Sequence, residues 1–288
     1  MNIKLQIPHV LRARGFRLYL SNGKRLVDLW LNGGAAVLGH TSANLLRELK
    51  NTASRGLYAP FPHFTESRLL KALVKLFPGY SFRLYASLPE GLMEKFSHRG
   101  TENTENTEGR RSRMVNLWRP YTNPDNPFGV DDIPLFIPVL PGIQTWRDGL
   151  PLGLCIVAFQ TNCKENKQAT QKVFAETKNI FAQLPPNDAL SPILLTIAAR
   201  GIHNILAAQE RAKQKLPRIE KALKEDSSIW HKQGIYLTMK KEPSLEEWDI
   251  LFNKFFEAGF LLPPTPVHPL ILPGELSDGE EAKLASVI

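Results

Sequence analysis

Apolar and polar positions near the start of the chain predict an antiparallel hairpin. Residues 15–31 contain two apolar-rich runs on either side of Asn22-Gly23, and this dipeptide is a strong signal for a tight turn between two strands. Glycines follow at positions 33, 34 and 39 and favour turns. We therefore expect two paired strands, a glycine-rich turn and then a short helix in the segment that ends at Lys50.

A helical pattern comes next. Apolar residues recur at a spacing of three and four between Ser67 and Phe77, which is typical of a helix with one buried face. Pro78-Gly79 cannot continue a helix and should end it. Residues 81–87, SFRLYAS, then predict a short strand.

The second half of the chain alternates between strand and helix patterns. Residues 152–159, LGLCIVAF, predict a buried strand. A helix follows that either Asp188 or Ser191 can cap, with Pro192 in its first turn, and its pattern extends to about Leu223.

Capping signals define the helices near the end of the chain. Ser244 and Glu247 form a capping box ahead of an apolar stripe that Gly259 closes. Ser277 and Glu280 repeat the same box before a final short helix. Strands are expected at 234–240 and 269–272. Because strands and helices alternate, the fold class is α/β or α+β.

Two segments interrupt these patterns. Residues 97–113 repeat Thr-Glu-Asn and contain no apolar residue, so they cannot form a packed core and predict a linker. Residues 120–141 are dense in proline. Each proline removes a backbone donor, so neither a regular helix nor a central strand is expected there.

Composition places the chain among ordinary globular proteins. Of its 288 residues, 43% are hydrophobic and 22% are charged, and no stretch approaches the ~20 uninterrupted apolar residues of a membrane helix. The first residues lack the apolar region of a signal peptide. Cys155 and Cys163 provide neither a disulfide framework nor metal-ligand spacing. We therefore expect a cytoplasmic protein.

The formal net charge of +8 raises the question of nucleic-acid binding. The basic residues are dispersed, and the densest groups are Arg110, Arg111 and Arg113, and then Arg211, Lys213, Lys215 and Arg218. The second group shares a helical pattern with apolar residues on the opposite face, which is typical of a solvated surface. Nucleic-acid binding is not expected from this pattern.

Few residues outside these patterns suggest chemistry. His40 is expected to be a turn histidine ahead of a helix, and His203 and His231 have no ligand spacing. Gly201 lies within the long helical pattern and is expected to permit close packing. The chain contains no P-loop, GxGxxG, GxSxG, HExxH or CxxC motif.

Three segments together resemble the class III aminotransferases, the PLP-dependent fold type I family that includes the glutamate-1-semialdehyde aminomutases. Residues 14–46 resemble that family's N-terminal hairpin and the LGH stretch before a helix. Residues 148–157, DGLPLGLCIV, are similar to the GGLPLG segment that follows the catalytic lysine. Residues 257–284 resemble the end of the EAG helix, the strand and the last helix of the family.

The resemblance implies a split architecture. A small α+β domain would be built from both chain ends, residues 1–78 and 188–288, around a central PLP-binding domain. Residues 79–187 are too few for that family's seven-stranded sheet with its helices, so they would be a reduced remnant that includes the linker at 97–113. The chain would then be a truncated and degenerate relative of the family.

The resemblance also allows each element of PLP chemistry to be located. Counted back from Gly149, the position of the Schiff-base lysine falls on Gln144. An amide cannot form an imine or act as a general base. Ser87 and Gly149 remain as cofactor-binding residues by family position. Lysines 164, 167 and 172 lie beyond the following strand.

The remaining elements of PLP chemistry also depart from the family. The phosphate loop would follow residue 86. If Ser87 and Glu90 are matched, leucine and proline stand between them, and if Glu94 is matched instead, the serine becomes Leu88. The acid that pairs with the pyridine nitrogen would fall near Val115. The nearby Asp125, Asp131 and Asp132 favour turn roles.

Two further family positions leave alternatives open. Where the family has a threonine that reaches the phosphate, this chain offers Asn187 and Ser191. Trp30, Tyr58 and Phe64 either line a substrate entrance, as matching positions do in relatives, or pack in a core.

The leading hypothesis from the sequence is a degenerate class III aminotransferase-like protein without transaminase activity. Such a chain could form a homo-oligomer or pair with a full-length relative, and PLP is its cofactor by family resemblance only. One alternative is an active PLP-dependent enzyme whose lysine comes from residues 164–178 or from a partner chain. Another is a basic scaffold that binds polyanions.

Overall fold

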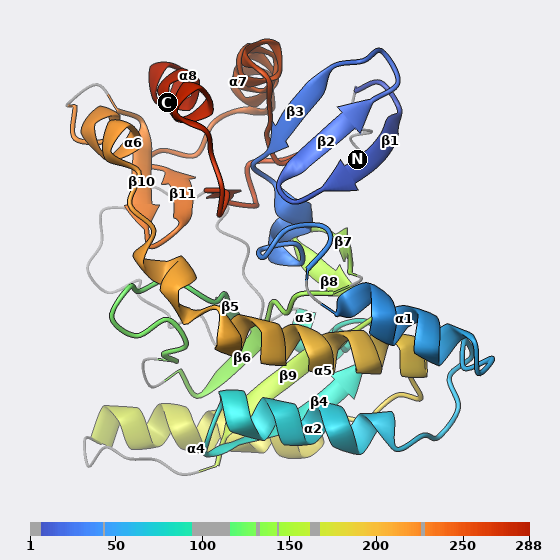
Figure 1. Ribbon diagram of the computed structural model, residues 1–288. Coiled ribbons are helices and arrows are strands. Elements are labelled where there is room, and N and C mark those ends of the chain that lie inside the picture. The colour runs from blue at the N-terminus through green and yellow to red at the C-terminus, as the bar shows by residue number, and fades with distance from the viewer. Residues whose placement is uncertain are drawn as a thin grey trace. The chain divides into compact units, whose positions relative to one another are not determined.

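The protein consists of α-helices and several small β-sheets (Figure 1). The computed structural model describes residues 7–42, 44–93, 116–130, 133–142, 144–161, 168–225 and 228–288. In helix α4 (Gln168–Gln183), the side chains of residues 168–173 and 176 lie outside that description. The predicted linker at 97–113 therefore lies outside the described residues.

The chain divides into two compact units. Unit 1 comprises Met1–Arg47, Pro120–Phe128 and His203–Ile288, and unit 2 comprises Glu48–Arg119 and Gly129–Ile202. Residues 48–78 and 188–202 thus pack with the middle of the chain, whereas the sequence assigned them to the end-built domain. Which unit corresponds to a small or a large aminotransferase domain remains a prediction.

Unit 1 contains two sheets among its described residues. The first has the order β1-β2-β3-β12 and is formed by β1 (Val10–Arg14), β2 (Arg17–Leu20), β3 (Arg25–Asp28) and β12 (Phe260–Leu261). The second has the order β10-β11-β13 and is formed by β10 (Trp230–Gln233), β11 (Tyr236–Met239) and β13 (Leu270–Ile271). The antiparallel pairing of β2 with β3 across Asn22-Gly23 confirms the predicted hairpin.

Three helices complete unit 1: α6 (Pro217–Ala222), α7 (Leu245–Ala258) and α8 (Asp278–Val287). Ser244 and Ser277 cap α7 and α8, each within a complete capping box, and Gly259 ends α7 in the left-handed conformation at φ 96°. All three predicted caps are confirmed. They were predictable because capping is a contact between residues three positions apart.

The α8 capping box also holds an ion pair with the first sheet. The Arg17 guanidinium donates two hydrogen bonds to Glu280, at 3.0 Å to Oε1 and 2.6 Å to Oε2. Glu280 Oε2 also accepts the Ser277 backbone N–H at 2.9 Å. Hydrogen bonding from Arg17, together with the bond from the Ser277 backbone, lowers the pKa of Glu280 to about 2.

We expect Glu280→Gln to reduce the free energy of unfolding by about 1 to 2 kcal/mol at neutral pH. Because the pKa of Glu280 falls from 4.5 to about 2 on folding, the stabilisation is present above pH 4.5 and is lost as the pH falls toward 2. Urea unfolding from pH 7 to pH 2.5 should show the wild type and the variant converging. Glu247→Gln is the matched control, since Glu247 occupies the same capping box position in α7 and forms no ion pair with an arginine among the described residues. We expect Glu247→Gln to reduce the free energy of unfolding by less than Glu280→Gln does.

Unit 2 is built on a four-stranded sheet of order β4-β9-β6-β5. Its strands are β4 (Tyr80–Tyr85), β5 (Asn116–Trp118), β6 (Leu135–Pro138) and β9 (Cys155–Gln160). Pairing is antiparallel between β4 and β9 and between β6 and β9, and parallel between β5 and β6. The strands β7 (Thr145–Arg147) and β8 (Leu150–Leu152) form a separate hairpin. The predicted strands at 81–87 and 152–159 are confirmed as β4 and β9.

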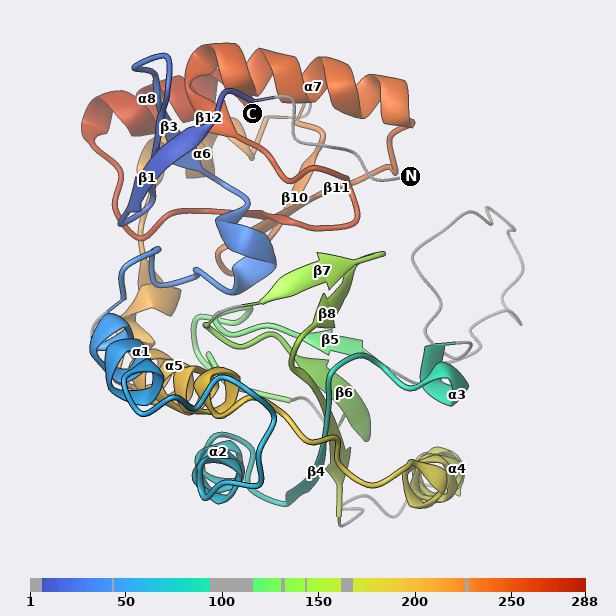
Figure 2. The ribbon, with the colours of Figure 1, turned by 90° about the vertical axis from the view of Figure 1, so that its right-hand side faces the viewer.

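Helices cover both faces of this sheet (Figure 2). Among the described residues, the helices that lie wholly or mostly in unit 2 are α1 (Leu45–Ala53), α2 (Thr65–Leu76), the four-residue α3 (Glu90–Met93), α4 and α5 (Pro192–Ala207). In Figure 2, α2 and α5 lie on one side of the sheet, and α3 and α4 lie on the other. All six residues of β9 are buried as a result. Its apolar run therefore reflects burial on two faces rather than one.

Strand β6 shows that the prediction for residues 120–141 was wrong. This strand lies between β5 and β9, in the interior of the sheet. Pro134 and Pro138 stand before and at the end of the strand. The backbone donors inside the strand are therefore retained, and Leu135 and Phe136 pair with β9. Proline excludes a strand only where it removes a needed donor.

The predicted helix from 188 to about 223 was also wrong in its extent. Helix α5 ends at Ala207, a short 3-10 turn covers Gln209–Lys213, and α6 begins at Pro217. A proline at position 217 cannot continue a helical hydrogen-bond ladder, although it fits the first turn of a new helix. Among these residues the chain therefore changes direction instead of extending one helix.

Arg211 departs from the predicted solvated face. Its guanidinium donates to the Leu272 carbonyl and to the side chain of Gln214, and it lies 5.6 Å from the centroid of the Phe16 ring. Burial lowers the pKa of Arg211 to about 10. Lys213, Lys215 and Arg218 are exposed, as expected.

Cys155 is a buried free thiol on β9. Burial raises its pKa to about 12, so the thiolate needed for nucleophilic chemistry is disfavoured. Cys163 lies outside the described residues. Within the described part of the chain, no helix is both long enough and apolar enough to cross a membrane.

Candidate functional site

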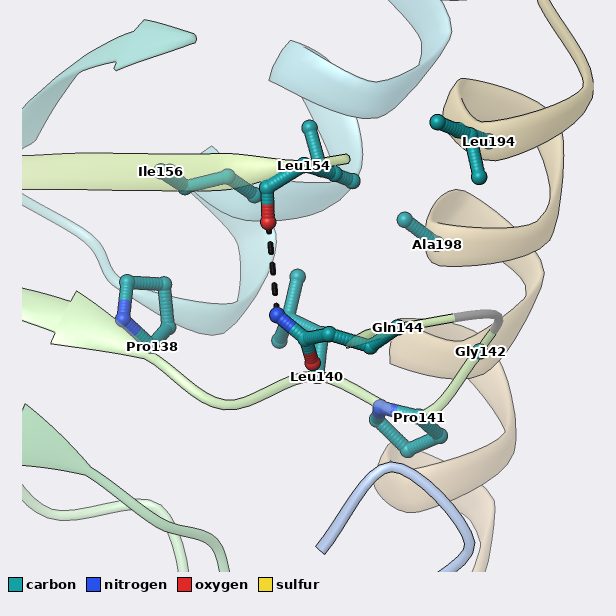
Figure 3. Close-up of a pocket in the computed structure, with 9 residues that line it drawn as sticks. All are labelled: Pro138, Leu140, Pro141, Gly142, Gln144, Leu154, Ile156, Leu194 and Ala198. Carbon is teal, nitrogen blue, oxygen red and sulfur yellow. Dashed lines mark hydrogen bonds between the residues drawn. The ribbon is translucent and has the colours of Figure 1, made fainter. Parts of the chain in front are cut away.

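A small hollow surrounds Gln144 in unit 2 (Figure 3). Its walls come from the end of β6 and the segment after it, from the start of β9 and from α5. The residues that line it are Pro138, Leu140, Pro141, Gly142, Gln144, Leu154, Ile156, Leu194 and Ala198. We call this hollow the Gln144 pocket. The position that the resemblance assigned to the Schiff-base lysine therefore does line a pocket.

The segment that carries Gln144 is held close to α5. A Cβ at Gly142 would stand 3.2 Å from Ile197 Cγ2, and a Cβ at Gly201 would stand 2.1 Å from the Pro141 carbonyl oxygen. The expectation that Gly201 permits close packing is confirmed. Because a Cβ at Gly201 would collide with the Pro141 backbone, the segment after β6 lies directly against α5.

Gln144 makes a structural hydrogen bond in this pocket. Its Nε2 donates to the Leu154 carbonyl oxygen at 3.3 Å, just before β9 begins. The other lining residues are apolar or glycine. An amide in these surroundings is neither a nucleophile nor a general base at neutral pH. The Gln144 side chain therefore connects the segment after β6 to the start of β9 through this hydrogen bond.

Ser87 and Gly149 are not brought to this pocket. Ser87 is exposed in the bend after β4, and Gly149 forms the turn of the β7–β8 hairpin at φ 77°. Neither residue is among those that line the Gln144 pocket. The three positions taken from the resemblance therefore do not converge on one site in the described structure.

The segment after Ser87 is packed in the core. Leu88 and Leu92 are 4% and 0% exposed and belong to an apolar cluster that also contains residues of β6 and β9. The Leu92 N–H donates to the Pro89 carbonyl at 2.9 Å. A phosphate cradle needs several unpaired amide donors at a helix N-terminus, and α3, at four residues, is too short to supply them.

The residues present around Gln144 do not fit PLP. No lysine lines the pocket. Its cavity volume is about 10 Å³, which is room for about one water molecule. Clefts that hold cofactors are on the order of 300 to 1,000 Å³.

The other positions named from the sequence take structural roles or fall outside the description. Asp125 is exposed in a turn closed by a 2.9 Å bond from its N–H to Asn123 Oδ1, which confirms the turn interpretation for that residue. Val115, Asp131 and Asp132 lie outside the described residues, as do Lys164, Lys167 and the side chain of Lys172. Lys178 is described and is exposed on α4.

Asn187 takes part in the fold of unit 2. Its Oδ1 accepts the Leu84 N–H at 3.1 Å, and its Nδ2 donates to Glu66 Oε1 at 2.8 Å. The next residue, Asp188, accepts the Ala86 N–H at 2.8 Å instead of capping α5. Both residues therefore anchor the end of β4, a role that no local pattern indicated.

The structure decides between the interpretations of some of the aromatic and histidine residues. Tyr58 and Phe64 are 63% and 55% exposed, so core packing was the wrong interpretation for both. His40 lies in a turn, as expected, with Nε2 2.9 Å from Asp28 Oδ2. Among the described residues, no group of three or more His, Cys, Asp or Glu side chains could hold a metal ion.

No family model matches the chain. Among curated proteins, an uncharacterized protein of Treponema pallidum is 27% identical over 92% of this chain and 88% of its own length. An uncharacterized protein of Borreliella burgdorferi is 37% identical over 30% of this chain and 34% of its own length. A glutamate-1-semialdehyde 2,1-aminomutase of Lawsonia intracellularis is 31% identical over 32% of this chain and 22% of its own length.

Solved structures resemble the whole chain. An omega-transaminase from Sphaerobacter thermophilus has a TM-score of 0.62 at 13% identity, with 97% of this chain and 89% of that chain covered. An ornithine aminotransferase from Plasmodium yoelii has a TM-score of 0.55 at 16% identity, with 99% and 94% covered. The fold is therefore the α/β fold of the PLP-dependent aminotransferases of fold type I. At these identities the likeness establishes the fold alone.

Proposed function

We propose that this chain is a non-catalytic protein of aminotransferase fold that lacks transaminase activity. The observation that carries the proposal is the Gln144 side chain, which donates to the Leu154 carbonyl and to which the resemblance assigns the position of the Schiff-base lysine. An amide cannot form a covalent bond to an aldehyde under these conditions, nor can it take a proton from a substrate carbon.

Two further observations support the proposal. The loop at Ser87 contributes Leu88 to the apolar core, and a buried leucine offers nothing to a phosphate. The pocket itself has room for about one water molecule. Restoring a lysine at position 144 would therefore still leave PLP without a cleft and without a phosphate cradle.

Trapping with borohydride tests the proposal directly. Purified protein is incubated with PLP, reduced with borohydride and examined by peptide mass spectrometry, with an active transaminase as the positive control. We expect no pyridoxyl-lysine peptide above the background of a denatured sample. A stoichiometric adduct on a single lysine, including one between 164 and 178, would contradict the proposal and favour an active enzyme.

The variant Gln144→Lys distinguishes two reasons for inactivity, the loss of the lysine amine and the lack of a cleft for the cofactor. We expect this variant to give no adduct either, because the pocket around position 144 is too small for the cofactor. If Gln144→Lys gains a stoichiometric adduct while the wild type has none, the loss of the amine alone explains the inactivity.

In place of this chemistry, we propose that the protein acts by binding. We propose that it is cytoplasmic and that it forms a homo-oligomer or pairs with a full-length aminotransferase. Size-exclusion chromatography with light scattering, alone and with such a relative, measures both kinds of assembly. Salt-sensitive retention on heparin would instead favour the polyanion-binding alternative.

A further inference from the structure

A second hollow lies in unit 2 among α1, α2 and α5, which are neighbours in both views (Figures 1 and 2). Its volume is about 90 Å³, which is room for several water molecules, against about 10 Å³ for the Gln144 pocket. The residues that line it are Glu48, Asn51, Thr52, Arg55, Leu57, His63, Phe64, Thr65, Arg68 and Thr196. We call it the arginine pocket. It shares no lining residue with the Gln144 pocket.

The arginine pocket carries a net positive charge. Arg55 and Arg68 are exposed, and among the described residues neither guanidinium lies within ion-pair distance of a carboxylate. Glu48 is the acidic member of the lining, and its Oε1 lies 2.9 Å from the Arg200 guanidinium. Because Arg200 balances the charge of Glu48, the two remaining guanidinium groups are available to an anion.

A buried hydroxyl group also lines the pocket. Thr196, on α5, is 7% exposed, and its Oγ1 has no hydrogen-bond partner among the described residues. The other two threonines are satisfied, since Thr52 Oγ1 donates to the Glu48 carbonyl at 2.9 Å and Thr65 Oγ1 lies 3.1 Å from His63 Nδ1. An unpaired buried hydroxyl costs free energy that a ligand acceptor would recover.

The start of α2 adds to the positive potential. This twelve-residue helix begins at Thr65, and its N-cap residue Phe64 makes no side-chain capping bond, although Glu66 stands in its first turn and the Thr65 N–H donates to His63 Nδ1 at 3.3 Å. The N-terminal end of a helix carries a partial positive charge that favours anions. The Phe64 ring, with the Arg68 guanidinium 5.9 Å from its centroid, stands at the exposed side of the pocket.

We propose that the arginine pocket binds a small oxyanion, whose carboxylate or phosphate group contacts Arg55 and Arg68 and accepts a hydrogen bond from Thr196. The volume accommodates such a group but not a cofactor. This inference is independent of the proposed absence of catalysis, because no residue of the Gln144 pocket takes part in it.

Calorimetry and thermal unfolding with inorganic phosphate and with acetate test the inference. Each anion is compared with chloride at equal ionic strength, so that general screening is the same in all samples. We expect phosphate, acetate or both to bind the wild type and to raise its Tm above the value in chloride. The stronger of the two responses identifies the group that the pocket prefers.

Substitutions locate the binding. Arg68→Gln should lower the affinity for the anion by about tenfold or more, because it removes one charged hydrogen bond. Thr196→Val should lower the affinity about fivefold. In chloride alone, Thr196→Val should leave the Tm unchanged or raise it by about 2 °C, because it removes an unpaired buried hydroxyl. If Thr196 had only a structural role, Thr196→Val would not weaken anion binding.

Lys75→Gln is the matched control. Lys75 is an exposed cation in the last turn of the same helix, and it does not line the pocket. Its removal should change the affinity less than twofold. The inference is overturned if neither anion binds more strongly than chloride, or if Lys75→Gln weakens the anion as much as Arg68→Gln does.

Discussion

Asp28→Ala is expected to reduce the free energy of unfolding by about 3 to 5 kcal/mol. Asp28 ends β3 and is 2% exposed. Its Oδ1 accepts the N–H groups of Trp30 and Leu31 at 2.8 and 2.9 Å, and its Oδ2 lies 2.9 Å from His40 Nε2. Without the carboxylate, these donors lose their acceptor inside the protein, and each orphaned buried group costs about 1 to 3 kcal/mol.

Asp28 also maintains an unusual backbone. Leu31 and Asn32 have φ values of 46° and 49°, in the left-handed region that costs about 1 kcal/mol or more for residues other than glycine. The bonds to Asp28 hold the start of this segment in place. The local conformation therefore depends on these two bonds and should relax when the carboxylate is removed.

Urea unfolding at neutral pH, followed by circular dichroism, measures the effect. Asp28→Asn keeps one acceptor oxygen and the shape of the side chain, so we expect a loss of only about 1 to 2 kcal/mol. Asp125→Ala, at an exposed aspartate, should stay within about 0.5 kcal/mol of the wild type. Equal losses for Asp28→Asn and Asp28→Ala would show that charge, and not hydrogen bonding, is the main contribution.

Gly201→Ala is expected to reduce the free energy of unfolding by about 2 kcal/mol. A Cβ at this position would stand 2.1 Å from the Pro141 carbonyl oxygen and 3.0 Å from its carbonyl carbon. Both are backbone atoms, so the segment after β6 must move away from α5. The overpacking cost of up to about 3 kcal/mol exceeds the gain of at most about 1 kcal/mol from better helix propensity.

Gly279→Ala is the matched control for that substitution. Gly279 is also helical, in α8, and a Cβ there would meet no atom within 4 Å. Its stability should be unchanged or rise by up to about 1 kcal/mol. If both alanine variants behave alike in urea unfolding, the close approach of Pro141 to α5 does not limit stability, and the Gln144 pocket is less tightly held than its geometry indicates.

Local patterns predicted the elements that depend on near neighbours. The hairpin at Asn22-Gly23 and the two capping boxes were confirmed because their determining contacts lie within a few residues. The proline-dense stretch misled because the effect of a proline depends on whether its donor is needed in a sheet. Pro138 closes β6 at a position where the strand ends.

The candidate site was predictable only in part. The resemblance drew attention to Gln144, which lines a pocket, but it did not indicate that Ser87 is exposed or that Leu88 is packed in the core. The arginine pocket had no signal at all in the sequence. Its walls combine residues 48–68 with Thr196 on α5, and no periodic pattern connects positions so far apart.

Hairpins, helix caps and the absence of a lysine at position 144 could be read from the residues alone, because they are local properties, and the alternation of elements gave the fold class. Where those elements meet depends on the packing of the folded chain. The contact of Gly201 with Pro141 closes the Gln144 pocket, and the packing of α1, α2 and α5 opens the arginine pocket. Pockets form where side chains from distant segments fail to fill space, and that depends on packing in three dimensions.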